Sequence, residues 1–73
     1  MLMNNIELDV KTKCIEEDVT QAKLAELAGT SPSYVCRLIG SGDKVINKTF
    51  LKMMDSLGYD VCISYVKKEN GGE

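Results

Sequence analysis

The stretch from Thr20 to Gly40 reads TQAKLAELAGTSPSYVCRLIG and carries the signals for two short helices joined by a tight turn. Thr20 is a good N-cap residue for a helix whose leucines and alanines fall on one face. Gly29 follows that face directly, where a helix that ends in the left-handed conformation favours glycine. Ser31 supplies the next N-cap, because Pro32 then takes the first helical position, where its missing N–H costs nothing.

Small and apolar side chains are expected to hold these two helices together. Ala25 stands where the helices cross closely, and we expect four apolar side chains to lock them around it. These four are Leu24, Ala28, Val35 and Leu38.

The outward positions of the second helix are Ser31, Ser33, Tyr34 and Arg37, which are polar or hydrogen-bonding and include no acid. Such a face suits a helix that enters the major groove of DNA. Arg37 can form a bidentate pair with guanine, and its plainer interpretation is an arginine in a surface ion pair. Tyr34 can pack on a thymine methyl group, reach a phosphate or be partly buried, and capping alone also explains Ser31.

The flanking sequence predicts two further helices. Ile6, Val10 and Cys14 form one stripe of a helix from about residue 6 to residue 17. Asn47 or Thr49 can cap another helix that runs to Leu57 and is stopped by glycine. Its apolar stripe is expected to be Phe50, Met53, Met54 and Leu57.

Residues 61–66 read VCISYV and predict a β-strand with Val61, Ile63 and Tyr65 on one face. A strand needs a partner for its backbone groups, and we expect that partner to be the same strand of a second copy. The predicted fold is therefore mainly α, with four to five short helices, a helix-turn-helix and one C-terminal β-strand that pairs across a dimer. We expect a single domain over residues 1–73, with a core at about 6–58, a dimerisation strand at 59–67 and a disordered tail at 68–73.

Charge is distributed unevenly along a chain whose formal net charge is only −2. Residues 1–29 carry three lysines against six acids, which gives −3, and residues 55–73 carry two lysines against four acids, which gives −2. Residues 30–54 carry one arginine and three lysines against one acid, which gives +3. A local basic region can bind phosphate even in a mildly acidic chain, and Lys44 and Lys48 are either phosphate contacts or simply solvated.

Composition argues against several other classes of protein. No apolar run approaches the ~20 residues of a membrane span, and the start of the chain does not read as a secretory signal, so we expect a cytoplasmic protein. Without histidine, a phosphate loop or closely spaced cysteines, we expect no enzyme activity, no metal and no cofactor. The three cysteines are expected to be reduced thiols, and a redox role for Cys36 is the less favoured alternative.

The segments TQAKLAELAGTSPSYVCRLI and FLKMMDSLG resemble the phage repressor and Cro-like (Xre-type) helix-turn-helix family, over about residues 6–58. The resemblance implies that the first motif helix lies across the DNA backbone, with Gln21 on a phosphate. It also implies that the second helix presents Ser31, Ser33, Tyr34 and Arg37 to the major groove. Pro32 stands where members often have a polar base-contacting residue, so that contact is expected to be lost. A terminal strand in place of a further helix resembles the members that pair through a strand.

We therefore expect a sequence-specific transcriptional regulator, a repressor that binds a palindromic operator in double-stranded DNA as a homodimer. The alternative is a protein-interaction module, such as an antitoxin that neutralises a toxin through its acidic N-terminal half.

Overall fold

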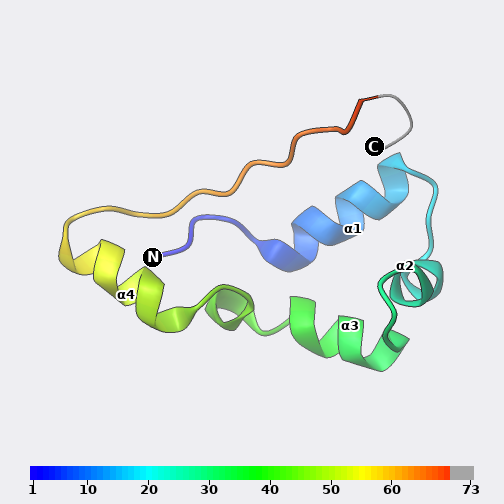
Figure 1. Cartoon of the computed structure of the whole chain (residues 1–73), viewed down its shortest axis with the longest axis horizontal. Helices are drawn as coiled ribbons and strands as arrows, with labels where there is room; N and C mark the ends of the chain where they lie inside the picture. Colours follow the sequence, from blue (N-terminus) through cyan, green and yellow to red (C-terminus); the bar gives the residue numbers. More distant parts are fainter. Residues whose placement is uncertain (70–73) are drawn as a thin grey trace.

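The computed structural model describes residues 1–69, which are mainly helical (Figure 1). The helices are α1 (Ile6–Glu16), α2 (Gln21–Leu27), α3 (Pro32–Ile39), the 3₁₀ helix η1 (Gly42–Val45) and α4 (Lys48–Ser56). The predicted class and the four α-helices are thus confirmed. Most of the predicted tail, residues 70–73, lies outside the described residues.

Side-chain caps decide where the helices begin. The side-chain oxygens of Thr20, Ser31 and Asn47 accept hydrogen bonds from backbone N–H groups three residues later, at 3.0, 3.2 and 3.1 Å. Each bond satisfies a donor that the first helical turn leaves without a partner. The predicted caps Thr20 and Ser31 are confirmed, and Asn47 rather than Thr49 begins α4. Gly29 has a φ of +74°, as the turn between α2 and α3 was expected to require.

The contact between α2 and α3 is built on the smallest side chain available. Ala25 is completely buried, and Val35 and Ile39 of α3 pack against it at 6% exposure each. Half-buried Leu24 also joins this cluster. The prediction was wrong for Ala28 and Leu38, which are exposed. Val35 and Ile39 are four residues apart and share one helix face. Leu38 lies at the edge of that face, and 38% of its surface is exposed.

A second apolar cluster joins the two ends of the chain. Leu2, Ile6 and Leu51 are buried together, and half-buried side chains from η1 and the C-terminal segment pack against them. The predicted apolar stripe was wrong for Phe50, Met53 and Leu57, which are exposed, whereas its fourth member, Met54, is half-buried. The neighbouring face of α4, which carries Leu51, is the one that meets the chain ends.

The predicted C-terminal strand is not confirmed within residues 1–69, where the only β-pairing is an isolated parallel bridge between Leu2 and Val61. The N–H of Val61 donates to the carbonyl of Met1, and the N–H of Met3 donates to the carbonyl of Val61, both at 2.8 Å. Pairing stops there because the chain turns into α1, and the side chain of Asn4 takes over. It accepts from the N–H of Ile63 at 2.8 Å and donates to the carbonyl of Ile63 at 2.9 Å.

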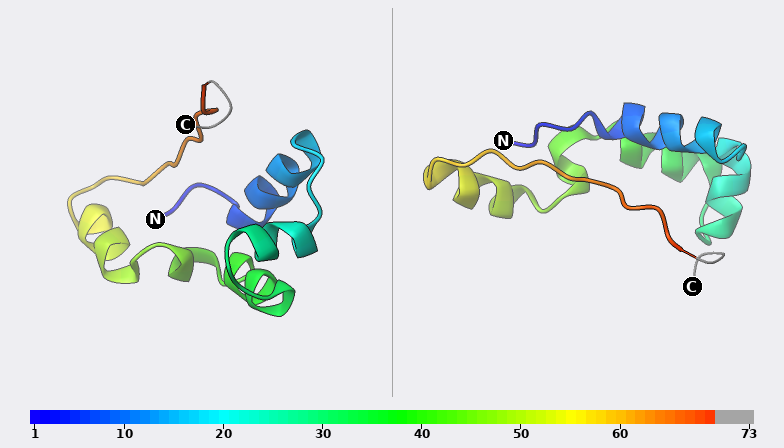
Figure 2. Two further views of the ribbon diagram at one scale, coloured as in Figure 1. Left: turned by 45° about the vertical axis from the view of Figure 1, so that its right-hand side comes forward. Right: turned by 90° about the horizontal axis from the view of Figure 1, so that it is seen from above.

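The C-terminal segment (residues 59–69) therefore lies beside the start of the chain and then beside α1. It runs along the side of the molecule opposite α3 in both Figure 1 and the left view of Figure 2. Val61 and Ile63, which favoured a dimer strand, thus pack within their own chain.

Enlarging Ala25 should separate α2 from α3. We expect Ala25→Leu to lower the free energy of unfolding by about 1–3 kcal/mol, as overpacking of a filled core does. Exposed Ala22 lies in the same helix, and Ala22→Leu should change the free energy by no more than about 0.5 kcal/mol. Urea unfolding followed by circular dichroism measures both, and equal effects at the two positions would contradict the close crossing.

Candidate nucleic-acid interface

The N-terminus of α3 sets the direction of the predicted reading face. The Ser31 hydroxyl caps the helix through the N–H of Tyr34, and Pro32 occupies the first helical position. Val35 and Ile39 point inward on this helix, so the opposite positions are turned to solvent. Ser33, Tyr34 and Arg37 are exposed accordingly.

The two serines at this end lie close to one another. Their hydroxyl oxygens are 3.3 Å apart, and both residues are exposed. The Ser31 oxygen is committed to the cap, so the Ser33 hydroxyl is the freer hydrogen-bonding group of the pair. Cys36 is also exposed, and all three cysteines are free thiols. Residues 1–69 contain no group of three or more potential metal ligands.

Arg37 is held by an aromatic ring rather than by a carboxylate. Its guanidinium carbon lies 5.6 Å from the centre of the Tyr34 ring, one turn earlier in α3. No ion pair involves Arg37 within residues 1–69. The ion-pair alternative from the sequence therefore has no support among these residues.

Some lysines of the chain form ion pairs and others do not. Lys11, Lys13, Lys23 and Lys67 each lie within 4.0 Å of a glutamate oxygen. Lys44 in η1 and Lys48 and Lys52 in α4 are exposed and form no ion pair with any described residue. Arg37 and these three lysines lie on α3, η1 and α4, which follow one another along one side of the molecule (Figure 1). Lys68 of the C-terminal segment is the other lysine that forms no ion pair with a described residue.

The structure brings together some of the predicted residues and leaves others apart. Ser31, Ser33, Tyr34 and Arg37 share α3, and Lys44 and Lys48 follow in the next two elements. Gln21 is the first residue of α2 and is half-buried. Lys52 belongs with the unpaired lysines and was missed as a site residue, although the charge of residues 30–54 already included it.

The predicted dimerisation side chains face their own chain. Val61 and Ile63 are half-buried against the cluster of Leu2, Ile6 and Leu51. Tyr65 donates its hydroxyl hydrogen bond to Asp9 at 2.8 Å. Asn4 and Asp9, which hold this segment, were not found from the sequence, because their partners lie more than fifty positions away.

One backbone edge of the same segment is still free. The N–H and C=O groups of Val61 and the Ile63 N–H and C=O point to the N-terminal residues. The backbone groups of Cys62 and Ser64 have no hydrogen-bond partner within residues 1–69. Alternate residues of an extended chain direct these groups to opposite edges, so the outer edge is available for pairing.

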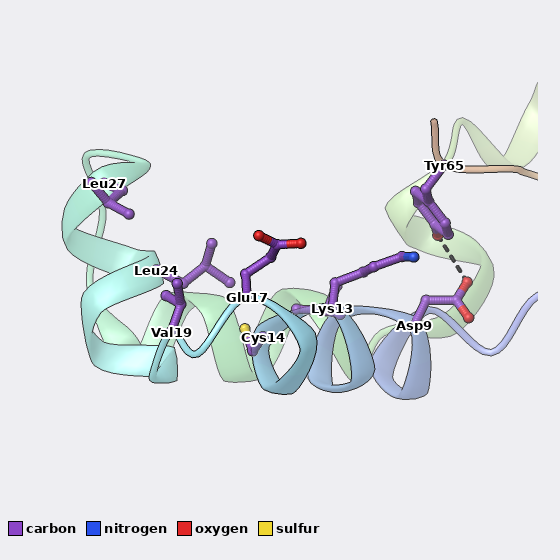
Figure 3. A pocket seen from close by; sticks show the side chains of 9 residues that line it. Asp9, Lys13, Cys14, Glu17, Val19, Leu24, Leu27 and Tyr65 are labelled. Atoms are coloured by element: carbon purple, nitrogen blue, oxygen red, sulfur yellow. Dashed lines mark hydrogen bonds between the residues drawn. The ribbon is translucent and has the colours of Figure 1, made fainter. Parts of the chain in front are cut away.

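An apolar groove separates the C-terminal segment from α1 and α2 (Figure 3). Its volume is about 340 Å³, and its walls include Val10, Cys14, Val19, Leu24 and Tyr65. Asp9, Lys13 and Glu17 stand along α1 at its rim. The hydrogen bond from Tyr65 to Asp9 closes one end.

Two carboxylates bind the C-terminal segment to α1. Hydrogen bonds from Asn4 and Tyr65 lower the pKa of Asp9, and the hydrogen bond and charge of Lys67 lower the pKa of Glu17. Burial and the bond to Asp9 raise the pKa of Tyr65. All three pKa shifts favour the state in which Asp9 and Glu17 are ionised and Tyr65 is neutral, so that the carboxylates accept hydrogen bonds from Tyr65 and Lys67.

No helix of residues 1–69 is long and apolar enough to cross a membrane. Comparisons of the chain with protein-family models, with curated proteins and with solved structures found no match. Function must therefore follow from the arrangement of the side chains themselves.

Acid should loosen the C-terminal segment. A carboxylate whose folded pKa is lowered stabilises the fold above its unfolded pKa of about 4, and this contribution is lost as the pH falls through the folded value. Asp9→Asn mimics the protonated group, so it should be less stable than the natural chain at neutral pH. Thermal unfolding between about pH 7 and pH 2 should show this difference shrinking as the natural chain is acidified. A difference that stays constant with pH would contradict the role of Asp9.

Proposed function

We propose that the chain is a sequence-specific DNA-binding protein, a transcriptional repressor of the phage repressor and Cro-like type. In this proposal α2 and α3 form a helix-turn-helix, and α3 enters the major groove of double-stranded DNA. The observation that carries it is the exposed, acid-free face of α3, on which Arg37 has no carboxylate partner among residues 1–69. The buried crossing at Ala25 packs the inner side of α3 against α2 and so turns that face to solvent.

Arg37 is the residue proposed to read a base. A guanidinium has five N–H donors in a planar fork that matches O6 and N7 of guanine, and such a pair contributes about 1–3 kcal/mol of discrimination. Ser33 and Ser31 are short donors that suit a phosphate or a base edge. Pro32 offers no side-chain donor, so a base contact at its own position is not expected.

The unpaired lysines are proposed to contact the DNA backbone. Lys44, Lys48 and Lys52 follow α3 directly and have no acidic partner among residues 1–69, so a phosphate would not have to displace one. Gln21 at the start of α2 is proposed to bind a phosphate by hydrogen bonding, as the family resemblance implies. Phosphate contacts release counterions, so binding should weaken steeply with salt.

A homodimer is proposed to form through the C-terminal segment. The outer edge at Cys62 and Ser64 has free backbone groups, and this segment lies opposite α3 (Figure 1). Antiparallel pairing of two such edges about a two-fold axis would leave both α3 helices exposed. Two-fold symmetry implies a palindromic operator, with half-sites about 34 Å apart.

A second candidate function is that of an antitoxin or other protein-binding module. The observation that favours it is a set of exposed apolar side chains, Phe50 and Met53 of α4 and Leu57 directly after it. Exposed apolar patches of this kind often mark protein interfaces. A short toxin-like reading frame beside the gene would favour this role, which is compatible with repression of the same operon.

Replacing Arg37 should reduce specific binding. Selection from random duplex DNA should enrich an inverted repeat, and Arg37→Ala should weaken binding to that repeat about 5- to 150-fold while relaxing the preference at one guanine position of each half-site. Fluorescence anisotropy on operators changed at single positions measures the preference. No enrichment for the natural chain would remove the proposed function.

Matched lysine variants separate base reading from charge. Lys44→Ala should weaken binding uniformly across sequences and reduce the slope of log affinity against log salt by about 0.9. Lys11→Ala removes the same charge from α1, where Lys11 pairs with Glu7, and should leave operator binding unchanged. An equal loss for Lys11→Ala would mean that only the net charge matters.

A proline in the outer edge of the C-terminal segment should prevent the proposed dimer. Ser64→Pro removes an N–H that has no partner in the single chain, and it leaves the Asn4–Ile63 bonds in place. We expect the natural chain to sediment as a dimer and Ser64→Pro as a folded monomer with weaker operator binding. Ser64→Ala is the control and should stay dimeric. A dimeric Ser64→Pro chain would place the interface elsewhere.

A further inference from the structure

Tyr34 and Arg37 form a pair because they are three positions apart in α3. Three positions apart on a helix, the two side chains are neighbours on one face. Arg37 lies 5.6 Å from the centre of the Tyr34 ring, within the range of a cation–π contact. Both side chains are on the exposed face, where Tyr34 keeps 43% of its surface accessible.

Among residues 1–69, the Arg37 side chain forms no ion pair and no hydrogen bond. No carboxylate lies within ion-pair distance in the part of the chain that is described, and α3 itself contains no acid. Tyr34, in contrast, is fixed at its backbone, because its N–H donates to the capping oxygen of Ser31 at 3.2 Å. The backbone of Tyr34 is therefore fixed in the first turn of α3, and the Arg37 guanidinium lies over the ring that this residue carries.

We propose that Tyr34 is a positioning residue that holds Arg37 in the conformation that reads guanine. This inference rests on the proposed function and assigns Tyr34 a role that acts through Arg37 rather than on a base. A guanidinium that lies on a ring uses its flat face, so its N–H edge stays free for a bidentate pair. An ion pair would instead occupy the donors that the base needs.

The arrangement has a thermodynamic consequence for specificity. A long side chain that is already ordered loses less conformational freedom when it binds its base. The benefit appears only where Arg37 is correctly paired, so Tyr34 should affect discrimination at the guanine position and leave non-specific binding unchanged. The tyrosine hydroxyl is not required, because the ring face makes the contact.

Three variants test the inference with operators that carry guanine or another base at the Arg37 position. Tyr34→Leu keeps an apolar side chain without a ring and should lower the preference for guanine about two- to fivefold, the size of an exposed cation–π contact. Tyr34→Phe should restore the natural preference. Tyr34→Leu combined with Arg37→Ala should have no larger effect than Arg37→Ala alone, and the salt dependence should be the same for Tyr34→Leu as for the natural chain.

A measurement without DNA checks the contact itself. NMR should show the side-chain protons of Arg37 shifted by the ring in the natural chain and in Tyr34→Phe, and unshifted in Tyr34→Leu. If the natural chain prefers guanine and Tyr34→Leu keeps the full preference, the positioning role is overturned while the proposed function stands. If the natural chain selects no sequence, the proposed function fails and the positioning role fails with it.

Discussion

The close crossing of α2 and α3 at Ala25 is the constraint on which the rest of this small structure depends. An alanine with no exposed surface lets two short helices approach until Val35 and Ile39 fill the space around it. Neither helix is long enough to be stable alone, so each exists because of this packing. Once the inner face of α3 is fixed in this way, its outer face is fixed as well.

Local signals in the sequence were sufficient to predict most features of the helices. The caps Thr20 and Ser31 and the turn at Gly29 depend on residues only a few positions apart, so the sequence predicts them correctly. The outward facing of Tyr34 and Arg37 follows from the same helical period. Their contact with each other also follows from a spacing of three, although the sequence alone did not single it out.

Features that depend on distant contacts were not predictable in the same way. In and just after α4, both Leu51 and the predicted stripe with Phe50, Met53 and Leu57 are apolar, and the packing of Leu2 and Ile6 decides that the face with Leu51 is buried. Met54, the fourth member of the predicted stripe, is half-buried. The sequence predicts a second copy as the partner of the C-terminal segment, because residues 1–4 carry no strand pattern. Their role depends on a few backbone bonds and on one amide side chain, Asn4, which hydrophobic periodicity does not reveal.

The pairing of the two chain ends also orders the events of folding. The α2–α3 contact joins residues near in sequence, whereas the bonds between Asn4 and Ile63 close a loop that spans nearly the whole chain. Closing a long loop costs more conformational entropy, so we expect the ends to close last and to open first by local unfolding. In the closed form the bonds of Val61 and Ile63 hold the segment in place, and its outer edge at Ser64 is free. Association of two chains would then stabilise closure by mass action, and the protein's own concentration would decide how often its ends are open.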